Sequence, residues 1–334
     1  VACRPLARQG AVAGDTLTGD HRARMSQVAD HNADHDGPAV VKMPGAARAV
    51  LSDGRRQHFH HGPIDLVIEA SGAADDVAQA YDRAWRRFET ILGELVADLP
   101  TLRRAAVAQP AVSSSTARRM VAACVDHDDV YVTPMAAVAG AVADEILAAM
   151  TAGRYLTKAY VNNGGDIALH LAEDQSFKTG MVTLGETPNA DGVATINAAD
   201  GVGGIATSGW RGRSHSLGIA DSVTVLAPDA ATADVAATLI ANAVDVESAA
   251  ITRVPARDLD PDSDLGDRLV TTEIGHLTPA DMDAALKAGQ ECAQTLVDRR
   301  IILAASLVLQ NRRVFAAGSI AGAISTPDRK AIAA

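Results

Sequence analysis

The chain is poor in aromatic residues, which limits how a core can be built. Phe, Tyr and Trp together make up 3% of the 334 residues, although 48% of the residues are hydrophobic. A core must therefore consist mainly of Ala, Val, Leu and Ile. The chain is long enough to bury such a core as one large domain or two smaller ones.

Cysteine is also scarce. The three cysteines, Cys3, Cys124 and Cys292, are widely separated and form no CxxC pair. This spacing argues against a disulfide framework and against a cysteine-based zinc site. Since no apolar segment typical of a signal peptide follows Val1, we expect reduced thiols and a cytoplasmic location.

Positive charge and long apolar runs are lacking as well. The net charge is -11, which disfavours nucleic acid because its recognition needs a basic face. The same charge disfavours an anionic membrane surface, and no run approaches the ~18 apolar residues of a membrane helix. The expected partner is a small-molecule ligand rather than nucleic acid or membrane, and association into a homodimer stays open.

Several common signatures are absent. The chain contains no GxGxxG, GxxxxGK[ST] or GxSxG segment. The acidic stretch Asp258–Asp267 fails as a calcium loop, because Leu265 stands where glycine is needed and Thr271 where glutamate is needed. His58 and His60 share one face of an expected strand, a spacing compatible with a metal, but no nearby carboxylate is evident.

The chain divides into an extension and one folded domain. Residues 1–45 lack hydrophobic periodicity, so we expect a mobile N-terminal extension. Residues 46–334 are expected to form a single α+β domain, because runs of strands are separated by helices without strict alternation. The patterns predict helices at 73–96, after Ser113–Thr116, and at 133–150, 230–244 and 278–299. They predict a hairpin at 48–60, strands at 63–69, 159–162, 166–172, 177–184, 193–197, 204–207, 217–226 and 301–309, and an acidic loop at 255–267.

The stretch Tyr160–His170 is the most informative segment. An apolar strand leads into Gly164 and Gly165, and Asp166 follows at once. The two glycines let the backbone approach a bound group at little steric cost. Asp166 would then lie at the mouth of the turn, as an acceptor or a general base. This turn is therefore a candidate ligand site.

A second candidate turn follows the strand at 204–207. Thr207, Ser208 and Gly209 offer hydroxyl and backbone N–H groups, which phosphate or carbonyl recognition requires. Turns rich in Ser and Gly are also common without any ligand. Ser208 is a candidate nucleophile for which no base can be assigned.

Three basic side chains come just after this turn. Arg211 and Arg213 can neutralise a phosphate or carboxylate, and His215 precedes Asp221 at a spacing compatible with an acid–base pair. An ordinary exposed loop would carry the same residues.

Asp234 and Thr238 lie four residues apart on an expected helix, so their side chains project from one face. A carboxylate and a hydroxyl suit Mg²⁺, which keeps several waters and takes few protein ligands. The simpler alternative is that Asp234 lies in the first turn, where a carboxylate interacts favourably with the helix dipole.

These segments together resemble the ApbE-type flavin transferase superfamily, the FAD:protein FMN transferases, and most closely its uncharacterised bacterial and archaeal branch. The likeness spans about 47–309 and is densest in 59–66, 132–144, 162–167, 204–213 and 217–226. The resemblance implies an α+β fold of mixed or antiparallel sheets packed with helices, with a ligand cleft between two halves. It also implies FAD and Mg²⁺ as the bound groups.

The resemblance assigns roles to particular positions. The turn from Asn163 to Asp166 and the turn from Thr207 to Gly209 are similar to flavin-lining segments. Asp234 and Thr238 match the family's magnesium pair, and the backbone carbonyl of Val138 would be a third ligand. Asp166 or His215 would orient or deprotonate the acceptor hydroxyl.

Two departures leave the reaction open. Ala139 stands where the family has lysine, and the loop 215–221 is shortened. We therefore expect a Mg²⁺-dependent transferase that acts on FAD, by FMN transfer or pyrophosphate cleavage. The alternatives are a hydrolase of a small anionic metabolite, with Arg211, Arg213 and His215 binding the substrate, and a non-catalytic flavin- or nucleotide-binding protein.

Overall fold

The computed structural model describes residues 45–106, 110–127, 130–153, 155–183, 189–318 and 324–325. The extension expected at residues 1–45 lies, apart from Gly45, outside the described residues.

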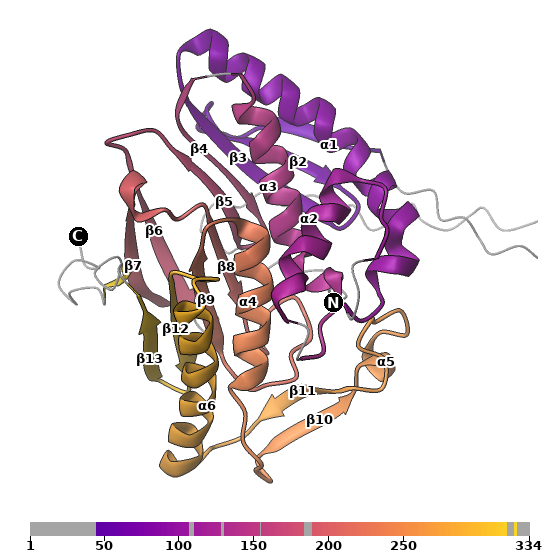
Figure 1. Ribbon diagram of the computed structural model, residues 1–334, viewed down its shortest axis with the longest axis vertical. Helices are drawn as coiled ribbons and strands as arrows, with labels where there is room; N and C mark the ends of the chain where they lie inside the picture. The colour runs from indigo at the N-terminus through magenta and orange to yellow at the C-terminus, as the bar shows by residue number, and fades with distance from the viewer. Residues whose placement is uncertain are drawn as a thin grey trace, which may run out of the picture.

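A nine-stranded antiparallel sheet forms the centre of the molecule (Figure 1). Its strands, in spatial order, are β1 (Ala47–Val50), β2 (Gln57–His61), β3 (Ile64–Gly72), β4 (Leu156–Asn163), β5 (Asp166–Leu171), β8 (Gly204–Ser208), β9 (Ser222–Ala227), β12 (Ala304–Leu309) and β13 (Arg312–Ala317). Every pairing in this sheet is antiparallel.

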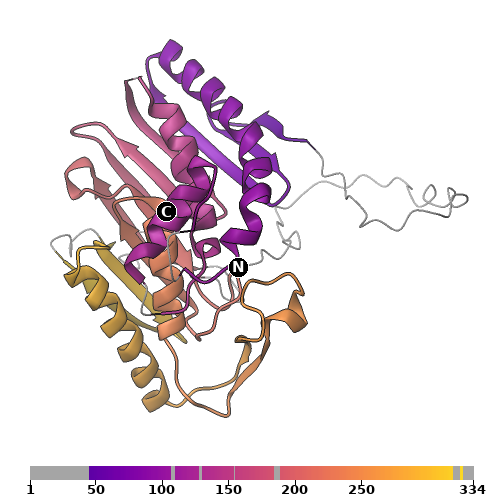
Figure 2. The ribbon, with the colours of Figure 1, turned by 45° about the vertical axis from the view of Figure 1, so that its right-hand side comes forward.

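The long helices cover one face of this sheet (Figures 1 and 2). They are α1 (Ala74–Leu102), α2 (Ser115–Cys124), α3 (Val138–Thr151), α4 (Ala230–Ala243) and α6 (Pro279–Asp298), with 3-10 turns η1 (Val125–His127) and η2 (Pro134–Ala137) before α3. The core beneath them is mainly aliphatic, and Phe59, Trp85 and Phe88 form its one aromatic group among the described residues, with ring centroids 5.2–6.0 Å apart.

The segment Pro134–Thr151 is long and apolar enough to cross a membrane by composition alone. In the structure, 61% of it is buried inside the protein, as for a core helix.

The opposite face of the sheet is covered only in part. The hairpin of β6 (Ser176–Thr183) and β7 (Asn189–Asn197), joined by β14 (Ile324–Ser325) and followed by η3 (Ala198–Asp200), forms a second sheet. A smaller core of Leu169, Ile196, Val202, Ile205 and Leu226 lies on this side.

The expected α+β class is confirmed, and so are most of the expected elements. Ser114 caps α2 by accepting the N–H of Ala117 at 3.1 Å, as the serine run predicts. Thr133 makes no such cap, because its hydroxyl bonds Asp264 instead. The strand expected at 217–226 begins only at Ser222.

The acidic loop expected at 255–267 forms the tip of a small arm and includes one short helix. The arm consists of β10 (Ile251–Pro255), α5 (Ala256–Leu259) and β11 (Leu269–Ile274), and its two strands pair with each other. Near its tip, the carbonyl of Asp264 accepts the Tyr131 hydroxyl at 2.8 Å, and Arg268 stacks over the Tyr131 ring at 3.3 Å. Midway along its strands, the N–H of Thr271 bonds the carbonyl of Ser216 at 2.9 Å.

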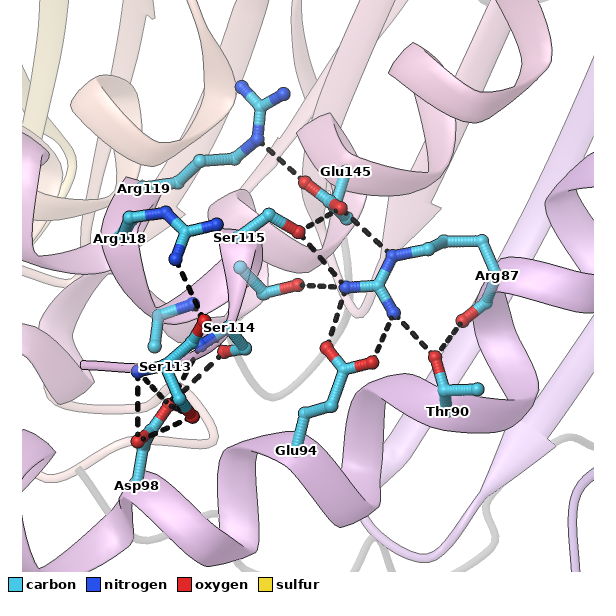
Figure 3. A network of polar contacts seen from close by, with 12 residues as sticks. Arg87, Thr90, Glu94, Asp98, Ser113, Ser114, Ser115, Arg118, Arg119 and Glu145 are labelled. Atoms are coloured by element: carbon cyan, nitrogen blue, oxygen red, sulfur yellow. Dashed lines mark hydrogen bonds and ion pairs between the residues drawn. The ribbon is translucent and has the colours of Figure 1, made fainter.

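A polar network ties α1, α2 and α3 together (Figure 3). The Glu145 carboxylate of α3 accepts Nε of Arg87 from α1 and Nε of Arg119 from α2, both at 2.9 Å. The Ser115 hydroxyl at the start of α2 donates to the same carboxylate. Three helices are therefore joined at one half-buried point.

Helices α3 and α4 make a close backbone contact. A Cβ added at Gly140 would overlap the carbonyl oxygen of Ala230, which is backbone and cannot rotate away. The alanines of both helices allow this approach; Ala141, Ala230 and Ala231 are buried there.

Replacing Gly140 by Ala should therefore lower the free energy of unfolding by about 2 kcal/mol or more, because the helices must separate. Gly93 is the matched control: it lies exposed within α1 with nothing near an added Cβ. Gly93→Ala should raise stability by about 1 kcal/mol through helix propensity alone. Urea unfolding of both variants measures this; a stabilised Gly140→Ala protein would contradict the packing.

Candidate functional site

The turn between β4 and β5 places two polar side chains side by side. Gly164 and Gly165 both have positive φ, 68° and 118°, which favours glycine at these positions. Asn162 closes the turn by accepting the N–H of Gly165 at 2.9 Å. Asn163 pairs with Asp166 across the strands, so both side chains share the helix-covered face. Asn163 then donates to the carbonyl of Ala139 at 3.0 Å, which fastens the turn to the start of α3.

The Asp166 carboxylate is held at this point by backbone and charge. It accepts the N–H of Thr207 from β8 at 3.3 Å. Burial raises the pKa of Asp166 to about 7, although the N–H of Thr207 and the charge of Arg213 act in the opposite direction. Asp166 is therefore able to exchange a proton near neutral pH.

Asp234 comes to the same place from α4. Its Oδ2 accepts the N–H of Gly140 at 3.0 Å. Burial and the negative charge of Asp166 raise the pKa of Asp234 well above its ordinary value. Burial and the charge of Asp234 also raise the pKa of the Cys124 thiol to about 12. Beside the start of α3, Asp234 thus interacts electrostatically with Asp166 and, separately, with the Cys124 thiol.

The helix-dipole explanation of Asp234 does not match the structure. Helix α4 begins at Ala230, so Asp234 lies beyond the first turn. The first N–H groups of α4 are bonded by Asp229, at Thr232, and by Asp144, at Ala230 and Ala231.

The two arginines expected to bind an anion are separated. Arg213 lies against the glycine turn, since a Cβ added at Gly164 would be 2.5 Å from its Nη1. Its Nε is buried without a hydrogen-bond partner among the described residues. Arg211 instead stacks on Trp210 at 4.5 Å and contacts Asp221 at 3.4 Å. Only Arg213 therefore belongs to the group around Asp166.

The turn after β8 presents its residues to both faces of the sheet. Thr207 is exposed and bonds the Thr224 hydroxyl at 2.9 Å, on the face away from the helices. The side chain of Ser208, the next residue, points to the opposite face, which is the helix-covered face where Ala206 also lies. A Cβ at Gly209 would meet the carbonyl oxygen of Asp221 at 2.5 Å, so this close approach needs glycine.

The hypothesis of a pair between His215 and Asp221 gains no support from the described contacts of Asp221. Its carboxylate accepts Nε1 of Trp210 at 3.1 Å, Nε of Arg211 and the N–H of Gln310 at 2.6 Å. His215 is half-buried, beside the loop that is bonded to the arm.

Thr238 lies one turn after Asp234 on α4, and both side chains are half-buried. The N–H of Ala139 is directed at Asp234, so the Val138 carbonyl of the same trans peptide points the other way. Asp234 and Val138 would bind one ion together only if Asp234 released this N–H. Among the described residues, no three His, Cys, Asp or Glu side chains converge, so a cation here would depend on other oxygens as well.

Two contacts were not foreseen from the sequence. Asp144, a buried carboxylate in an alanine-rich helix, bonds the start of α4; its position among apolar residues is the signal that could have revealed it. His58 pairs with Asp65 at 2.9 Å, so the expectation of no nearby carboxylate is wrong.

The antiparallel sheet, its helical layer and the glycine turn define an α+β domain with one candidate ligand site among the described residues. The chain belongs to the family described as AbpE bacteria, whose model matches residues 48–323. The resemblance to the ApbE-like superfamily is thereby confirmed.

Relatives from methanogenic archaea share part of the sequence. A UPF0280 protein of Methanothrix thermoacetophila is 41% identical over 116 residues, which cover 34% of this chain and 47% of the relative. A UPF0280 protein of Methanocella arvoryzae is 39% identical over 145 residues, which cover 42% of this chain and 56% of the relative. The chain spans about half the length of the curated relatives it matches.

Among solved structures, the apo form of the Pseudomonas stutzeri flavinyl transferase ApbE matches with a TM-score of 0.40 and 12% identity. The match covers 85% of this chain and 94% of that one.

The raised pKa values predict how stability depends on pH. From the ordinary value of 3.8 up to about 7, the folded protein binds more protons at Asp166 than the unfolded chain does. Stability from this group is complete at low pH and is lost as the pH rises through that window. Asp166→Asn should flatten the slope by up to about 1.4 kcal/mol per pH unit. Urea unfolding between pH 5 and 8 measures this; an unchanged slope would contradict the assignment.

Proposed function

We propose that this protein binds a flavin and acts as a Mg²⁺-dependent transferase on FAD. One observation carries the proposal: Asp166 and Asp234, from a strand and a helix far apart in sequence, interact beside the glycine turn. Membership of the family supports this reaction class.

A divalent cation suits the pair. Each carboxylate disfavours the charge of the other in a buried setting, and a cation between them would relieve this repulsion. Asp234 and Thr238 would hold the ion, with water completing the oxygen shell. The Val138 carbonyl would join them if Asp234 turned away from Ala139.

A flavin nucleotide suits the turns. The backbone at Gly165 lies open to close approach, and the Arg213 guanidinium lies beside Gly164. Thr207, Ser208 and Gly209 would provide the facing edge. Arg213 would neutralise a phosphate. It would replace the family's lysine in this role, because Ala139 stands at the position of that lysine. Arg211 is the weaker candidate, since Asp221 already engages it.

In the proposed reaction, an acceptor oxygen bonds to the FMN phosphorus as the bond to AMP breaks. The bound Mg²⁺ would stabilise the charge that develops on the pyrophosphate. Asp166, kept ionised by the nearby cation, would take the proton of the acceptor hydroxyl as the general base. Ser208 and His215 would orient the acceptor. With water as the acceptor, the products would be FMN and AMP.

The purified protein should bind added FAD, with a change in flavin absorbance near 450 nm. With Mg²⁺ it should release AMP, and EDTA should stop the release. Recovery of intact FAD after long incubation with Mg²⁺ would indicate a flavin-binding protein without catalytic activity. No flavin binding together with turnover of another anionic compound would favour a hydrolase.

Thr238→Val should weaken Mg²⁺ binding by at least about tenfold, because one of few protein oxygens is lost. Thr232→Val is the matched control: Thr232 lies on the same helix but lines a separate surface hollow with Pro228 and Arg300. Isothermal titration with MgCl2 measures both affinities. Equal weakening in the two variants, or in neither, would discredit Thr238 as a ligand.

A further inference from the structure

Helices α3 and α4 cap each other. Asp234 of α4 accepts the N–H of Gly140 at the start of α3, at 3.0 Å. Asp144 of α3 accepts the N–H groups of Ala230 and Ala231 at the start of α4, at 3.0 and 2.9 Å. Helix α3 has no side-chain cap from its own preceding residue, Ala137.

Asp144 is not needed as an ordinary cap for α4. That helix has its own cap, since Asp229 accepts the N–H of Thr232 at 2.8 Å. Asp144 is 8% exposed and reaches α4 from a different helix. Its bonds therefore join two helices rather than only completing one.

The geometry of this joint is rigid. Both N–H groups that bond Asp144 belong to the backbone, so they cannot rotate away as side chains do. The glycine contact at Gly140 brings the same two helices together, so packing and hydrogen bonds act at one place.

Helix α3 is also held by hydrogen bonds to other elements. Glu145, next to Asp144, is bonded to Arg87 of α1 and Arg119 of α2 (Figure 3). The start of α3 is also bonded to Asn163 of β4. The body of α4 stays packed on β8 and β9, but loss of the joint would loosen its first turns from α3, and Asp234 with them.

We propose that Asp144 is a positioning residue, which holds α4 against α3 so that Asp234 keeps its bond to Gly140 and faces Asp166. The relevance to ligand binding rests on the proposed function. The positional effect itself does not, and it is measured first.

The test compares Asp144→Ala with Asp229→Ala. Each variant removes one carboxylate from the same helix terminus, but only Asp144 connects α4 to α3. Amide hydrogen exchange of Gly140, relative to the most protected amides of the sheet, reports the bond to Asp234. We expect this exchange to quicken at least ~10-fold in Asp144→Ala and to stay within ~2-fold of wild type in Asp229→Ala.

Asp144→Asn serves if the alanine variant does not fold, because it keeps the size of the side chain but replaces one accepting oxygen by an NH2 group. Circular dichroism checks the fold of each variant. Unchanged Gly140 exchange in the Asp144 variants overturns the proposal. Equal loss of protection in Asp229→Ala does so too, because the effect would then be general fraying of α4.

Titration with MgCl2 adds the functional readout. Wild type and Asp229→Ala should bind alike, and Asp144→Ala should bind at least ~10-fold more weakly. If wild type binds no Mg²⁺, the proposed metal site fails while the exchange result still decides the role of Asp144. If wild type and Asp144→Ala bind equally, Asp144 does not position a ligand.

Discussion

The candidate site depends on how closely α3 packs against α4. Gly140 and the surrounding alanines let the two backbones meet without intervening side chains. This contact brings the start of α3 within hydrogen-bond distance of Asp234. Asn163 of the glycine turn donates to the neighbouring carbonyl of Ala139. The β4–β5 hairpin is therefore attached at the point where the two helices meet. A scarcity of aromatic residues, visible from composition alone, is consistent with packing of this kind.

The charge of Asp234 needs an explanation beyond hydrogen bonding. An asparagine oxygen would accept the same backbone N–H groups without placing a second carboxyl group near Asp166. Burying two interacting acids is unfavourable unless a proton or a cation compensates. Such pairs gather at functional sites more often than elsewhere, although structural ion pairs also perturb pKa values. The raised pKa values of the two acids follow from this cost, which helix capping alone does not offset.

Much of the fold could be predicted because its strands and helices carry strong local patterns. The turn residues Gly164 and Gly165 and the spacing of Asp234 and Thr238 are equally local, so sequence reasoning reached them. Their convergence is a tertiary property: no spacing rule indicates that Arg213 contacts Gly164 while Arg211 turns to Asp221. The paired strands of the arm were missed because the acidic residues between them dominated that stretch. The role of Asp144 was also out of reach, since its partners are backbone groups of another helix.

The arm of β10, α5 and β11 is fastened at two distant points of the chain. The middle of its strand β11 bonds Ser216, next to His215, and its tip bonds Tyr131 and Thr133, which lead into η2 and α3. The loop after β8 and the entry to α3 are thus bridged by a segment that belongs to neither. Any change in the spacing of these two regions would have to break one of these hydrogen bonds or move the arm with it.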